Sequence, residues 1–154
     1  GRVWRFCPQP PEKEEVSSIS KQGILHHVEL YVDDLRVCKE FWGWFLTLMG
    51  YDVYQVWDQG ISYRLHDTYI VLVQTEQRFR KIPYHRCHSG LNHLAFHADS
   101  IEFIDDLTMQ LRQRGIPILY EDRHPYAGGE GYYAVFFEDP QRMKVEVVFS
   151  ADDL

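Results

Sequence analysis

Apolar and polar positions alternate in two similar stretches, LHHVELYVDD at residues 25–34 and LNHLAFHADS at residues 91–100. Each stretch begins with leucine, a polar residue, histidine and an aliphatic residue, continues with alternating residues and has an acidic residue near its end. The two stretches lie 66 residues apart. Alternation with a period of two is typical of strands that bury one face. The pattern therefore predicts two equivalent strands and an internal repeat.

A helical pattern follows each of these strands. Apolar residues recur near a 3.6-residue period until Gly50 in the first half and until Gly115 in the second. Three stretches rich in β-branched and aromatic residues then follow in each half. They are YDVYQVW, ISYRL and TYIVLVQ in the first half, and PILYED, YYAVFFED and MKVEVVF in the second. Both halves are thus predicted to be β-α-β-β-β, an α+β arrangement.

The domain boundaries follow from this repeat. Residues 23–75 form the first repeat and residues 90–150 the second, joined by a polar linker at residues 76–89 that contains Pro83. Residues 1–22 show no periodicity and are expected to be a disordered arm or a remnant of expression.

Composition narrows the function classes. With 45% hydrophobic and 15% aromatic residues, the 154-residue chain can bury one sizeable core. The net charge of −7, without a basic stripe, argues against a nucleic-acid partner. No apolar run reaches the ~20 residues of a membrane span and no signal peptide is visible, so a cytoplasmic protein is expected. Cys7, Cys38 and Cys87 lack metal-like spacing and are expected to be ordinary thiols.

Candidate metal ligands emerge when the two halves are compared. His27 and His93 hold the same position in the repeated strands, so their side chains should project equivalently. Aligning IVLV of the first half with VEVV of the second places Glu146 opposite Val71. A carboxylate in an apolar strand is costly to bury without a partner. Two imidazoles and one carboxylate are a ligand set for a divalent metal with open coordination positions.

Other interpretations of the histidines stay open. Taken singly, each candidate ligand could be a hydrogen-bonded core histidine or a solvent-facing carboxylate. His85 and His88 flank Cys87, but they lie in the linker and have no counterpart in the first half, so a metal site there is the weaker alternative. His97 lies roughly 13 Å along the strand from His93, too far to bind the same ion.

The quoted stretches resemble the vicinal oxygen chelate superfamily, which includes glyoxalase I, fosfomycin-resistance proteins, extradiol dioxygenases and bleomycin-resistance proteins. The resemblance rests on HVELYVDDL, GLNHLAF and EDPQRMKVEVV and covers about residues 23–150. It implies two βαβββ repeats that form a cup-shaped mixed sheet of the glyoxalase/dioxygenase type. It also implies a divalent metal (Zn, Mn, Fe, Ni or Co) in the cup, with ligand positions that match His27, His93 and Glu146.

A partner and a function are implied as well. Many members are homodimers, in which His27 would come from one chain and His93 with Glu146 from the other. The expected function is a divalent-metal-dependent enzyme acting on a small oxygen-rich substrate by electrophilic activation, of the lyase, isomerase, transferase or dioxygenase type. The alternative is a metal-free small-molecule or drug-binding protein of the bleomycin-resistance type. Glu29, on the same strand face as His27, is the candidate catalytic base, or else a solvent-facing or ion-paired carboxylate.

Three positions depart from named members of the superfamily. Val71 stands where glyoxalase I carries a fourth ligand that assists proton transfer, which counts against the isomerase reaction of glyoxalase I. Glu29 replaces a threonine of the fosfomycin-resistance transferases. Phe136 replaces a tyrosine of those transferases and the catalytic tyrosine of extradiol dioxygenases. The stretch GGEG at residues 128–131 is expected either to close over a substrate or to be a plain connection.

Overall fold

The computed structural model describes residues 20–150 and residue 152, so Cys7 and most of the predicted arm lie outside the described residues. The first half contains β1 (His27–Val32), α1 (Leu35–Leu48), β2 (Asp52–Trp57), β3 (Gly60–Leu65) and β4 (Thr68–Gln74). The linker contains a short 3₁₀ helix, η1 (Gln77–Phe79). The second half contains β5 (His93–His97), α2 (Ile101–Gln113), β6 (Tyr132–Glu138) and β7 (Lys144–Ser150). The predicted α+β class is confirmed.

The two helices begin and end where the sequence pattern predicts. The polar end of each repeated strand is the helix N-cap, since Asp34 accepts a hydrogen bond from Val37 N and Ser100 accepts one from Phe103 N. Gly50 lies just beyond α1 with φ of +96°, a left-handed conformation that glycine adopts without strain. None of the helices in the described part of the chain is long and apolar enough to cross a membrane.

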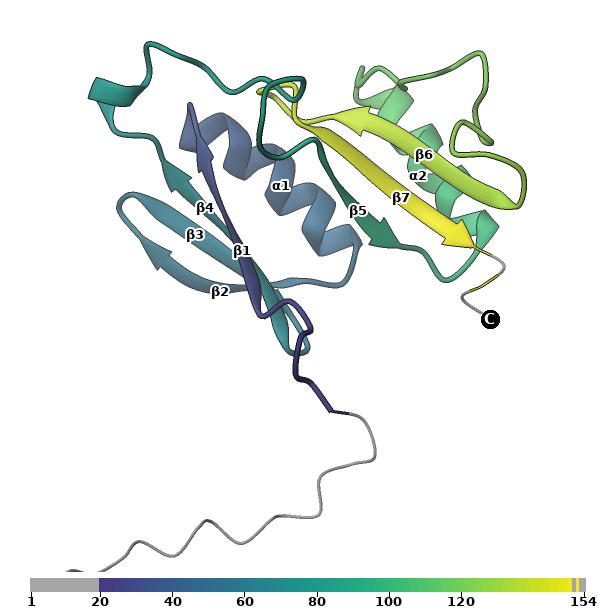
Figure 1. Ribbon diagram of the computed structural model, residues 1–154, viewed down its shortest axis with the longest axis horizontal. Coiled ribbons are helices and arrows are strands. Elements are labelled where there is room, and N and C mark those ends of the chain that lie inside the picture. The colour runs from purple at the N-terminus through teal and green to yellow at the C-terminus, as the bar shows by residue number, and fades with distance from the viewer. Residues whose placement is uncertain (1–19, 151, 153–154) are drawn as a thin grey trace, which may run out of the picture.

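The two halves form two small mixed sheets with corresponding strand orders. The first sheet has the order β1-β4-β3-β2 and the second β5-β7-β6. In each sheet the first and last strands of the half pair in parallel, and the other neighbours pair antiparallel. Figure 1 shows the sheets beside each other with both helices behind them. Each sheet therefore has an inner face toward the helices and an outer face away from them.

The prediction of a strand for PILYED, residues 117–122, is wrong. The structure has turns there and a single bridge, between Ile118 and Phe137. Tyr120 has φ of +56°, a left-handed conformation that ends an extended run. The chain then passes over the outer face of the second sheet, where Leu119 and Ala127 pack on a buried patch that includes Phe136. Through this bridge Ile118 lies beside β6, at the sheet edge that corresponds to the place of β2 beside β3 in the first half.

Both helices and both sheets share one core. The buried cluster includes residues from α1, α2 and the inner faces of both sheets, and Phe45 of α1 is fully buried in it. The Phe45 ring centroid is 5.3 Å from that of Phe96 on β5 and 5.3 Å from that of Phe137 on β6. Because the first helix packs on the second sheet, the two repeats form one packed unit.

Asp139, in the turn between β6 and β7, connects the second half to α1. Its residue surface is only 4% exposed, and its carboxylate accepts hydrogen bonds from Trp42 Nε1 at 3.0 Å, Gln141 N at 2.9 Å and Met143 N at 2.8 Å. Burial raises the pKa of Asp139 to about 6, although the three hydrogen bonds favour the ionised form. The acidic residue of the EDP motif thus holds the turn against the first helix.

Asp139→Asn should lower the free energy of unfolding by about 1–3 kcal/mol at pH 5, because the new amide turns a donor toward the Trp42 N–H. The folded-state pKa of Asp139 lies above its unfolded value, so its contribution to stability is complete below about pH 4 and falls as the pH rises through about 6. The difference in free energy of unfolding between wild type and Asp139→Asn, measured by urea unfolding from pH 4 to 7, should narrow as the pH rises. Asp52→Asn, an exposed control, should change neither the free energy of unfolding nor its pH dependence. A difference between wild type and Asp139→Asn that widens as the pH rises would contradict this prediction.

Candidate metal centre

Glu146 and His93 meet on the outer face of the second sheet. In the parallel pairing of β5 and β7, His93 lies opposite Lys144 and Ala95 opposite Glu146. His93 Nε2 is 3.6 Å from Glu146 Oε2. The Glu146 side chain is 5% exposed and that of His93 is 33% exposed, so the pair is reached from solvent through the imidazole. The structure thus brings two of the three predicted ligands together.

Tyr132, at the start of β6, completes the surroundings of the carboxylate. Its hydroxyl donates a hydrogen bond to Glu146 Oε1 at 3.0 Å. The tyrosine ring lies against Gly128, where an added Cβ would fall 2.3 Å from the ring Cδ1. A glycine at this point of GGEG therefore lets the loop backbone approach the ring closely. The pattern of the sequence did not predict this contact, because it depends on the path of the loop.

An apolar patch surrounds the pair. Phe136 lies opposite Glu146 in the antiparallel pairing of β6 and β7, and its ring centroid is 6.5 Å from that of His93. Ala134, Phe136 and Val148 form a small buried cluster covered by the loop after α2. Apolar surroundings exclude water and strengthen any electrostatic interaction of the Glu146 carboxylate.

His27, the third predicted ligand, lies on the other sheet. It is exposed at the start of β1, and its ring stacks on Tyr69 with centroids 4.6 Å apart and planes 5° from parallel. Its Nδ1 is 2.9 Å from Nδ1 of His26, one of the two acting as donor. Among the described residues of a single chain, no group of three His, Cys, Asp or Glu side chains could hold a metal ion. His27 is therefore not part of a three-ligand site formed by the described residues of its own chain.

The strand registers confirm the alignment of the two halves. Glu29 lies opposite Val71 in the pairing of β1 with β4, and Ala95 lies opposite Glu146 in the pairing of β5 with β7. Val71 and Glu146 are thus equivalent. The first sheet has a predicted histidine ligand without an acidic partner, and the second sheet has both predicted residue types.

The linker histidines do not gather around Cys87. The rings of His85 and His88 have centroids 4.9 Å apart, and Cys87 N donates to His85 Nδ1 at 3.1 Å, which is a local turn contact. In the part of the chain that the structure describes, no metal-binding cluster includes them. Cys87 is an exposed free thiol, whereas Cys38 is buried and burial raises its pKa to about 12.

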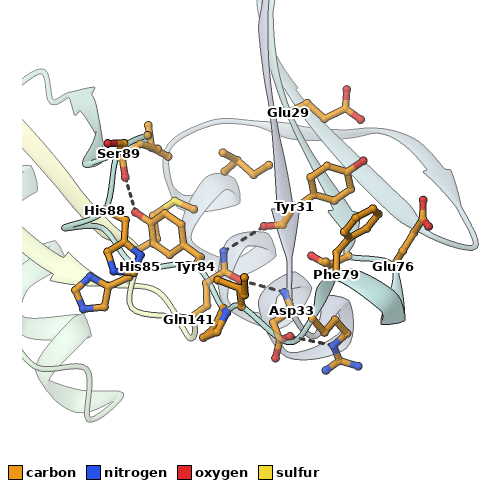
Figure 2. Close-up of a pocket in the computed structure, with 18 residues that line it drawn as sticks. Glu29, Tyr31, Asp33, Glu76, Phe79, Tyr84, His85, His88, Ser89 and Gln141 are labelled. Carbon is orange, nitrogen blue, oxygen red and sulfur yellow. Dashed lines mark hydrogen bonds and ion pairs between the residues drawn. The ribbon is translucent and has the colours of Figure 1, made fainter.

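A cavity of about 530 Å³ lies between the end of β1 and the linker. Figure 2 shows Tyr31 and Phe79 on one side of it and Tyr84 with the linker histidines on the other, with Glu29 at its edge. Gln141 fixes this end of β1, since its Nε2 donates to the carbonyl of Tyr31 at 3.3 Å. The volume is that of a pocket for a small organic molecule.

Comparison with known proteins places this fold in one superfamily. The sequence profile of the Glyoxalase/Bleomycin resistance protein/Dioxygenase superfamily matches residues 24–147. The uncharacterized protein YqjT of Bacillus subtilis (strain 168) is 54% identical over 124 residues, which is 80% of this chain and 97% of that protein.

Solved structures of similar proteins have the same fold. The crystal structure of a glyoxalase-like protein from Bacillus halodurans is 58% identical with a TM-score of 0.82 and covers 83% of this chain and 96% of its own. A mutant of the fosfomycin resistance protein FosX from Listeria monocytogenes, crystallised with Mn(II) and 1S,2S-dihydroxypropylphosphonic acid, has the same fold at 20% identity, with a TM-score of 0.58 over 82% of this chain and 90% of its own. The chain therefore belongs to the Glyoxalase/Bleomycin resistance protein/Dioxygenase superfamily.

Proposed function

We propose that this protein is a divalent-metal-dependent enzyme that acts on a small oxygen-rich substrate by electrophilic activation, with His27, His93 and Glu146 as the metal ligands. The contact between Glu146 and His93 carries the proposal, because a nearly buried carboxylate faces an imidazole 3.6 Å away. A buried ionised carboxylate costs several kcal/mol unless a cation neutralises it. A divalent ion supplies that charge, and imidazole and carboxylate are donors that such ions accept.

We also propose that a second copy of the chain supplies His27. This residue is exposed on β1 at the position that His93 has on β5, and it does not join the other two ligands within one chain. The outer face of the same sheet also exposes Tyr31, four residues farther along β1, and Trp57 on the edge strand β2. Exposed apolar patches and open strand edges are typical of interaction surfaces. A homodimer that covers this sheet could bring the partner's His27 to the pair on the second sheet.

Glu29 and Tyr132 have distinct roles in the proposed chemistry. Three protein ligands leave positions at which a divalent ion, when bound, supplies Lewis acidity to substrate oxygens. Glu29 lies roughly 7 Å along β1 from His27 and borders the cavity, so its exposed carboxylate can accept a proton from a substrate bound there. Tyr132 holds Glu146 in place through its hydrogen bond. The cavity accommodates the organic part of the substrate.

The cavity also favours a second candidate function, a metal-free binder of the bleomycin-resistance type. Three aromatic residues, Tyr31, Phe79 and Tyr84, line it together with aliphatic side chains. Aromatic walls of this kind hold flat apolar ligands. The two functions differ in their dependence on metal, because a binder would keep its affinity for a ligand after treatment with a chelator.

Glu146→Gln should weaken the binding of Zn²⁺ or Mn²⁺ by more than about 100-fold, because the amide keeps the volume and removes the charge that the ion neutralises. The measurement is a metal titration by calorimetry, with metal content after dialysis as a second readout. Glu40→Gln makes the same chemical change on the exposed surface of α1 and should bind metal as the wild type does. Equal affinities in all three proteins would rule out Glu146 as a ligand.

Tyr132→Phe should weaken metal binding by about 10–100-fold and leave the fold intact, because the hydroxyl orients the Glu146 carboxylate. Tyr133→Phe is a matched control, since the neighbouring hydroxyl donates instead to Asp105 on α2. Both variants are compared with wild type by metal titration and thermal unfolding. If Tyr133→Phe lowered metal affinity as much as Tyr132→Phe, the effect would be one of general stability and not of ligand orientation.

A further inference from the structure

Lys144 lies beside the Glu146–His93 pair on the outer face of the second sheet. Strand alternation puts Lys144 and Glu146 on the same face of β7, roughly 7 Å apart, and Lys144 lies opposite His93 in the parallel pairing. The Lys144 ammonium donates a hydrogen bond to the Tyr120 hydroxyl at 3.2 Å. The positive charge is thus held near the predicted ligands by a specific contact.

A second cation lies against the same tyrosine. Arg123 Cζ is 5.1 Å from the Tyr120 ring centroid, and Lys144 Nζ is 5.6 Å from it. The Tyr120 ring also meets Phe136 edge to face at 5.4 Å, and Phe136 neighbours His93. A continuous set of contacts therefore links both cations to the candidate metal centre.

Neither cation forms an ion pair with an acidic side chain of the described residues; Glu138, which lies opposite Lys144 in the pairing of β6 with β7, is paired with Arg86 and Arg142. Glu121, two residues before Arg123, is paired with Arg112 instead. Among residues 20–150, Lys144 and Arg123 form no ion pair with any carboxylate. Two cations that contact one tyrosine without an ion-pair partner create a local positive potential that favours a bound anion.

The backbone at Tyr120 fixes this arrangement. Its φ of +56° is rare and strained for an aromatic residue, and its carbonyl accepts hydrogen bonds from Arg123 N and His124 N, both at 2.9 Å. The turn places Arg123 back over the ring of Tyr120. Backbone strain of this kind persists where surrounding structure enforces it, and it is concentrated at ligand sites.

We propose that Lys144, Arg123 and Tyr120 form an oxyanion subsite that binds a carboxylate or phosphate-type group of the substrate. This inference rests on the proposed function and names the substrate class of the same site. The Lys144 ammonium supplies a point charge and the Arg123 guanidinium a planar pair of donors suited to such groups. Because Lys144 and Glu146 are roughly 7 Å apart along β7, the anionic group of the substrate is separated by several bonds from its metal-binding oxygens.

The test uses the metal-free full-length chain with inorganic phosphate and acetate as probes, each titrated by NMR of the backbone amides and by calorimetry. Phosphate or acetate should bind saturably and shift the amide signals of residues 120–124 and 144. Lys144→Gln and Arg123→Gln should each weaken binding at least about tenfold, since each removes a charge-assisted hydrogen bond. Lys39→Gln, on the exposed surface of α1, should leave the affinity unchanged. Circular dichroism of each variant checks the fold.

The two probes also distinguish the source of the anionic group. Tighter binding of phosphate than of acetate points to a phosphate ester or phosphonate, whereas equal or tighter binding of acetate points to a carboxylic acid. Absence of saturable binding of both anions to the wild type overturns the subsite, as does binding that both subsite variants retain. Because no metal is present, failure of the metal site leaves this result unaffected, and metal binding without anion binding overturns the subsite alone.

Discussion

A carboxylate that is nearly removed from water, that of Glu146, determines how the outer face of the second sheet is organised. An ionised group in such a place is stable only when hydrogen bonds and a positive charge replace its hydration. Tyr132 provides a hydrogen bond and His93 an imidazole at 3.6 Å. Gly128 allows the loop to hold the Tyr132 ring in position. The burial of this one acidic residue in an apolar strand thus depends on the loop after α2, the tyrosine and the histidine.

The two halves have corresponding strand orders but differ in which predicted metal ligands they carry. The position of Glu146 on β7 is held by Val71 on β4, so the first sheet presents His27 without a carboxylate. The single core shared by α1 and α2 fixes the two sheets relative to each other within one chain. The first sheet consequently exposes His27 without a carboxylate at the equivalent of Glu146, and the second sheet holds two of the three predicted ligands. This division gives the proposed homodimer its chemical reason.

Much of the fold could be predicted from the sequence because the signals are local. The 3.6-residue period with capping residues and glycine stops predicted both helices, and alternation predicted the strands. PILYED was predicted as a strand from composition, but the left-handed turn at Tyr120, closed by hydrogen bonds from Arg123 N and His124 N to its carbonyl, ends the extended run. The pairing of His93 with Glu146 could be predicted because strand register is periodic. The contact of Asp139 with Trp42 could not, since it depends on how α1 packs on the other half.

The most direct measurement of the shared metal site is the metal content of a mixed dimer. His27→Ala and Glu146→Gln chains with different affinity tags are co-expressed, and the mixed species is purified through both tags. If each site combines His27 of one copy with His93 and Glu146 of the other, the mixed dimer retains one intact site. It should then bind about one Zn²⁺ or Mn²⁺ per dimer with wild-type affinity, whereas either variant alone binds weakly. A mixed dimer that binds metal no better than its parents, or a chain that light scattering shows to be a monomer, would contradict a shared site.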